Sequence, residues 1–106
     1  MTRNLHNNYL VEHEMINVTG DHTIAAVAGK IIVVTSLILA NSVAEDVTIE
    51  SASVVLGHLD FNTAGDSKIV QHNPDGHWQT GNGVALVISA PSGTIIGSVV
   101  YALIDA

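Results

Sequence analysis

The chain has 106 residues, of which three are basic and ten acidic, so its formal net charge is −7. This length fits one domain with a hydrophobic core of its own, and the excess of acidic residues argues against nucleic acid or an anionic membrane surface as a partner. The absence of cysteine excludes disulfide scaffolds, cysteine-based zinc sites and thiol catalysis.

β-Branched residues dominate the composition: Val, Ile and Thr make up 33 of the 106 residues. Such side chains favour pleated sheets over helices. Short runs of them, separated by turn residues, predict an all-β fold, an antiparallel β-sandwich or barrel of about eight strands. The predicted strands lie near residues 9–18, 22–28, 30–40, 46–52, 54–59, 67–72, 84–90 and 94–104. We expect residues 1–20 to form an N-terminal arm or first edge strand, and residues 21–106 to form the sandwich.

No segment has the pattern of a membrane span or a signal peptide. The longest apolar run covers residues 31–40 and is interrupted by Thr35 and Ser36, whereas a spanning helix needs about 20 residues. The first twenty residues contain three charged side chains and no continuous apolar stretch.

Two of the predicted strands are apolar on both faces. Strict alternation over residues 30–40 places Ile32, Val34 and Ile38 on one face, and Ile31, Val33, Leu37 and Leu39 on the other. Residues 94–104 show the same pattern, whereas residues 46–50 alternate between polar and apolar like a half-exposed strand. Because a two-layer sandwich buries only one face of each strand, we expect another protein subunit to cover the second face. The alternative is a strand enclosed within a single barrel.

The region predicted to contact another subunit is the stretch of 29 residues from 76 to 104, which has no charged side chain. Interface cores are depleted of charge. The residues predicted to form an oligomer interface are Val84, Leu86, Ile88, Ile96, Val100 and Ile104.

No arrangement of residues points to catalysis, a cofactor, a small-molecule substrate or a metal ion. The six histidines include no pair at the spacing of a helical zinc motif, and the simplest interpretation of His58 and Asp60 is a local hydrogen bond. There is no nucleophile elbow and no phosphate-binding loop. We therefore expect a protein that is not an enzyme.

One turn is well defined by its residue types. Asn73, Pro74, Asp75 and Gly76 have the residue order of a type I turn, and Trp78, the only tryptophan, follows. We expect a tight corner with the indole packed under the edge of the sandwich. The alternative is an exposed aromatic side chain that binds a sugar or a partner protein.

Two longer segments together resemble a known family. Residues 22–40 read HTIAAVAGKIIVVTSLILA and residues 73–103 read NPDGHWQTGNGVALVISAPSGTIIGSVVYAL. The order of an Ala-Gly-Lys turn, an apolar strand, a Pro-x-Gly-x-Trp corner and a closing Gly-x-Val-x-Tyr strand resembles the jelly-roll-like decoration, or cement, proteins of tailed-bacteriophage heads and related head or tail accessory proteins.

The resemblance implies a virion role. It implies a homotrimer on the outer capsid surface that bridges neighbouring subunits of the major capsid protein, made in the host cytoplasm and needing no cofactor. In such families, arms that reach a neighbouring subunit lie at the N-terminus, which makes Arg3, Asn4, Leu5, Tyr9 and Leu10 the candidate capsid contacts. The alternative is a tail, fibre or carbohydrate-binding module that uses Trp78 and the adjacent loops.

Overall fold

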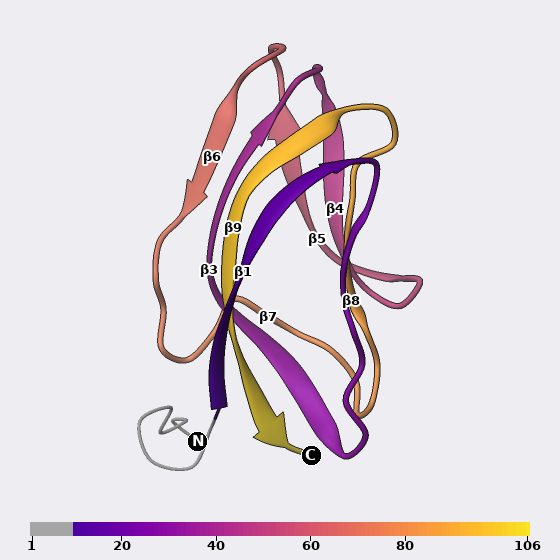
Figure 1. Cartoon of the computed structure of the whole chain (residues 1–106), viewed down its shortest axis with the longest axis vertical. Helices are drawn as coiled ribbons and strands as arrows, with labels where there is room; N and C mark the ends of the chain where they lie inside the picture. The colour runs from indigo at the N-terminus through magenta and orange to yellow at the C-terminus, as the bar shows by residue number, and fades with distance from the viewer. Residues whose placement is uncertain (1–9) are drawn as a thin grey trace.

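A computed structural model describes residues 10–106 and contains nine β-strands and no helix in that part of the chain (Figure 1). The strands are β1 (Leu10–Thr19), β2 (His22–Ile24), β3 (Lys30–Asn41), β4 (Glu45–Ser51), β5 (Val54–Phe61), β6 (Ser67–Val70), β7 (Trp78–Gln79), β8 (Leu86–Ser89) and β9 (Thr94–Asp105). The all-β prediction is confirmed, and eight strands lie where they were predicted. The two-residue β7 was not predicted, and β2 is shorter than the predicted 22–28.

The strands form two antiparallel sheets packed as a sandwich. Sheet A has the order β1-β9-β3-β6, with β7 also paired to β3, and sheet B has the order β2-β8-β4-β5. In Figure 1 the middle parts of β6, β3, β9 and β1 lie to the left of β4, β5 and β8, and the upper ends of β1 and β9 curve across to the right. The pairs β1–β9, β2–β8, β3–β6 and β4–β5 join the first strand to the last and continue inward along the chain. A long antiparallel hairpin wrapped into two sheets in this way is a jelly roll.

The core lies between the two sheets and takes alternate side chains from each strand. Ile16, Leu39 and Ile95 contribute from sheet A, and Ile49 and Leu86 from sheet B, all with at most 1% of their surface exposed. Burying each such side chain stabilises the fold by about 1.5–3 kcal/mol before the cost of ordering the chain. The period-2 burial pattern therefore identifies which side of each strand faces outward.

A β-bulge at Thr35 changes which side chains of β3 enter the core. Val34 pairs with Tyr101 and Ser36 pairs with Val100, so Thr35 is an extra residue without a partner in the ladder. Before the bulge Ile32 and Val34 point into the core, and after it Leu37 and Leu39 do so. The two faces predicted by strict alternation were therefore wrong beyond residue 34.

The predicted turn at residues 73–76 packs against this bulge. The amide of Gly76 donates to the carbonyl of Asn73 at 2.9 Å, which closes the turn, and the amide of Asp75 donates to the Asn73 side chain at 3.0 Å. The amide of Asn73 donates to the carbonyl of Thr35 at 2.9 Å. The turn thus occupies the position beside β3 between β6 and β7, and it uses a carbonyl at the bulge that would otherwise lack a backbone partner.

Candidate interaction surface

The outer face of sheet A is the side turned away from the core, and its strand positions contain no charged side chain. Registry and alternation place on it side chains from β1, β9, β3, β6 and β7. These are Val11, His13, Met15, Asn17 and Thr19; Thr94, Ile96, Ser98, Val100, Ala102 and Ile104; Ile31, Val33, Ser36, Ile38 and Ala40; Ser67 and Ile69; and Gln79. Asp75, in the turn beside β7, lines a hollow with Val33 at the margin of this face.

Large apolar side chains are exposed across all four main strands of this face. The most exposed are Met15 at 71% and Ile69 at 69%, on the two margins, with Ile38 and Ile96 between them at about half exposure. One cross-strand row runs Met15, Ser98, Ile38, Ile69. Single exposed apolar residues are ordinary, but a contiguous apolar patch marks a site of association.

The part of the same face formed by the start of β3 and the end of β9 is already buried in the single chain. Val33, Ala102 and Ile104 form a small second cluster with Ile31, separate from the main core. Two shallow hollows border the face, one of about 90 Å³ at Val33 and one of about 210 Å³ at Ile96. Both are smaller than the 300–1,000 Å³ typical of small-molecule pockets, so the shape favours a flat protein contact.

The outer face of sheet B has the opposite character. Asp46 and Glu50 on β4, with His58 and Asp60 on β5, point away from the core, while Val47 beside them is fully buried. Asp46 binds His58 across the strand pair at 2.6 Å, rather than the predicted local contact between His58 and Asp60. This charged, hydrated face confirms the half-exposed strand predicted at residues 46–50.

The structure corrects two of the six residues predicted for the oligomer interface. Leu86 and Ile88 are at most 1% exposed because they point into the core from β8, so no partner can reach them without opening the fold. Ile104 lies on the outer face of sheet A but is buried there in the small second cluster. Ile96 and Val100 do lie on the outer face of sheet A.

Val84, also predicted for the interface, is half-buried in the loop before β8. Sequence reasoning missed Val11, Met15, Ile38 and Ile69, which form most of the exposed patch. The available signal for this face was the alternation in β1, where Glu12 and Glu14 lie on one side of the strand and their uncharged neighbours on the other. This signal did not identify the outer face, because the two glutamates lie on the side that faces sheet B.

The candidate capsid-contact arm is mostly outside the described residues. Arg3, Asn4, Leu5 and Tyr9 all precede the described part of the chain, and Leu10 begins β1 by pairing with Leu103. Residues 10–19 form an edge strand of sheet A along their full length. This half of the segment 1–20 therefore belongs to the sandwich.

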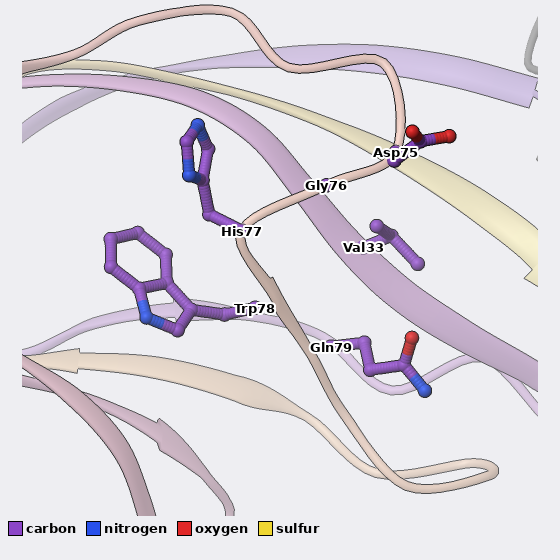
Figure 2. Close-up of a pocket in the computed structure, with 6 residues that line it drawn as sticks. All are labelled: Val33, Asp75, Gly76, His77, Trp78 and Gln79. Atoms are coloured by element: carbon purple, nitrogen blue, oxygen red, sulfur yellow. The ribbon is translucent and has the colours of Figure 1, made fainter. Parts of the chain in front are cut away.

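The indole of Trp78 packs into the sandwich. Figure 2 shows Trp78 and His77 projecting to one side of the chain, and Val33 and Gln79 to the other. Trp78 packs against the main core, and its Nε1 lies so close to Gly57 that a β-carbon there would clash with it. The indole therefore fills a structural corner, as one of the two sequence interpretations has it, and offers a sugar little free ring surface.

Comparison of the chain with family models, with curated proteins and with solved structures finds no match. The residues themselves, and above all the difference between the two outer faces, are therefore what indicates the function.

A cluster of ionisable groups joins the two sheets at the β1 side of the sandwich. Glu14 accepts a hydrogen bond from the Tyr101 hydroxyl at 2.8 Å, and its other oxygen lies 3.0 Å from His22 Nε2. Burial, the hydrogen bond to Glu14 and the negative charges of Glu14 and Glu12 raise the pKa of Tyr101 far above its usual value. The cluster lies outside both hollows, and the geometry fits a clamp between β1, β9 and β2.

Two further features are absent from residues 10–106. No group of three or more His, Asp or Glu side chains there is arranged to hold a metal ion. None of these residues belongs to a helix with the length and hydropathy of a membrane span.

Proposed function

We propose that this protein is a non-enzymatic structural protein of a virion, which decorates the capsid and stabilises it by bridging neighbouring capsid subunits. The observation that carries the proposal is the uncharged, apolar outer face of sheet A opposite a charged outer face of sheet B. A protein with one such face is built to be covered on that side by another protein and to be hydrated on the other.

Three further observations support the virion role. The segments at residues 22–40 and 73–103 resemble phage decoration proteins, and the jelly-roll strand order is common in viral capsid proteins, although lectin domains and cupins also use it. A fold alone does not assign a function. The net charge of −7 suits a location on the outside of a shell, away from packaged nucleic acid.

In this proposal the assembly is a homotrimer on the outer capsid surface, and the N-terminal segment contacts the major capsid protein. This segment combines the polar Arg3 and Asn4 with the largely apolar Leu5, Tyr9 and Leu10. Such a segment can pair hydrogen bonds and bury apolar surface in one contact.

Binding to purified capsids tests the proposal. Full-length protein is expected to co-sediment with capsids that lack it and to raise their resistance to heat, and cryo-electron microscopy is expected to show it on the outer surface. Deletion of residues 2–9 removes four of the five candidate contacts, all but Leu10, and leaves β1 intact, so it should weaken binding while the circular dichroism spectrum stays unchanged. Protein that neither binds capsids nor appears on them would refute the proposal.

A further inference from the structure

We propose that the outer face of sheet A is covered by a second copy of this chain. The inference rests on the proposed function and names the partner of this face, leaving the capsid contact to other parts of the molecule. The exposed side chains that define the face are Val11, Met15, Ile38, Ile69 and Ile96.

The size of the face suits a contact between copies. Three strands of ten to twelve residues and the four-residue β6, about 4.8 Å apart at about 3.3 Å per residue, span about 600 Å². Part of this area, at Val33, Ala102 and Ile104, is already buried, so two such faces bury less than about 1,200 Å² in total, which is the size of a weak, reversible contact. Because apolar side chains extend to both margins, at Met15 and Ile69, only a partner as wide as the sheet covers them all.

Large and small side chains alternate on this face in a way that allows one copy to interdigitate with another. In the row Met15, Ser98, Ile38, Ile69, the small Ser98 lies between two large side chains. In the next row Ile96 lies beside Ala40 and Ser67. Packed sheets fill the space between them by inserting large side chains opposite small ones.

Charge also favours a second copy. Each chain carries a net charge of −7, so copies repel one another wherever their charged surfaces approach. The carboxylates and histidine of sheet B, including Asp46, Glu50 and Asp60, lie on the far side of the sandwich from this face. Contact through the uncharged face therefore keeps the like charges apart, and screening the remaining repulsion with salt should strengthen it.

Sedimentation equilibrium of the full chain tests the inference. Wild-type protein is expected to self-associate between micromolar and millimolar concentration, and no less at high salt. Met15→Glu and Ile69→Glu place a charge on the face and should raise the dissociation constant by at least about tenfold. Val54→Glu is the matched control, since Val54 on β5 is 64% exposed but belongs to sheet B, and it should leave association unchanged.

Circular dichroism of each variant checks that the sandwich is still folded. Wild-type protein that stays monomeric throughout, or association that survives both face variants, would overturn the inference. Either result leaves the proposed function standing if the protein still binds capsids. Conversely, an oligomer that the face variants dissociate, but that binds no capsid, would support this inference and refute the capsid role. The face can be covered by the same face of a second copy, which closes a two-fold pair, or by a different surface of a neighbouring copy in the proposed homotrimer, and the measured mass separates the two.

Discussion

At the scale of single residues, Gly97 marks the closest approach of two strands. It lies in β9 opposite Leu39 of β3, and a β-carbon at this position would overlap the carbonyl oxygen of Ile38. A neighbouring backbone cannot retreat without disturbing the ladder, so Gly97→Ala should destabilise the fold by at least about 2 kcal/mol. Urea denaturation measures the loss.

Gly81 provides the matched control for that substitution. A β-carbon there would meet Val84 Cγ2 at 3.4 Å, an ordinary contact. Gly81→Ala is therefore expected to change the free energy of unfolding by no more than about 0.5 kcal/mol. If Gly97→Ala lowers the free energy of unfolding by no more than Gly81→Ala does, the approach of β3 to Gly97 is not as close as described.

The negative charge of Glu45 stabilises the fold. Its carboxylate accepts hydrogen bonds from the amides of Ser92 and Gly93, both at 2.9 Å, and from the Asn41 side chain at 3.0 Å. Burial acts to raise the pKa of Glu45, but the hydrogen bonds from Asn41, Gly93 and Ser92 outweigh it and hold the pKa below its usual 4.5. The charged carboxylate therefore fixes the turn before β9.

The stability from Glu45 should depend on pH with a definite sign. A folded-state pKa below the unfolded value contributes stability that is present above about 4.5 and is lost as pH falls through the folded pKa. We expect Glu45→Gln to lower stability by about 1 kcal/mol at neutral pH, allowing for partial exposure, and the gap to wild type to close in strong acid. Thermal melts across this range measure it, and a gap independent of pH would contradict the assignment.

At the scale of elements, the bulge at Thr35 determines which side chains of β3 face the core. Deleting Thr35 would join Val34 directly to Ser36 in continuous alternation, with Leu37 and Leu39 still facing the core. We expect this deletion to preserve cooperative thermal unfolding but to lower the melting temperature, because the amide of Asn73 loses its acceptor, the Thr35 carbonyl. Thr35→Ser should stay close to wild type, because it keeps the hydroxyl that donates to the Val100 carbonyl at 3.1 Å. A deletion variant that no longer unfolds cooperatively would show that the bulge itself is needed to set the register of β3.

The same bulge marks the limit of what the sequence predicts. Eight strands, the turn at residues 73–76 and the all-β class follow from β-branched runs and turn residues, because these are local preferences. The bulge, the two-residue β7 and the covering of Leu86 and Ile88 depend on which strands become neighbours, and no local pattern encodes that. The sequence predicts that some strands have a second apolar face. Only the pairing register of the strands in sheet A shows that Met15, Ile38 and Ile69 share this face with Ile96.

At the scale of the whole molecule, the sandwich has one charged and one uncharged outer face, and its single core is complete without a partner. The scarcity of charge in residues 76–104 therefore has two origins. Part of it reflects β8 and β9 side chains that fill the core, and part reflects the β9 contribution to the outer face of sheet A. Only the second part concerns association, which is why two of the six residues predicted for the interface from charge alone, Leu86 and Ile88, lie inside the core.

This division into two faces predicts an asymmetric chemical footprint. In an assembly that buries the outer face of sheet A, Met15, which is 71% exposed in the single chain, should be protected from oxidation to the sulfoxide. The side chain of His58, 60% exposed on sheet B, should remain reactive. Hydroxyl-radical labelling followed by mass spectrometry compares the wild-type assembly with the Ile69→Glu variant, which retains both reporters. Oxidation of Met15 should fall several-fold in the assembly while that of His58 stays constant. Protection of His58 in place of Met15 would mean that sheet B is the buried side, because a solvent-exposed methionine cannot escape a radical that diffuses with water.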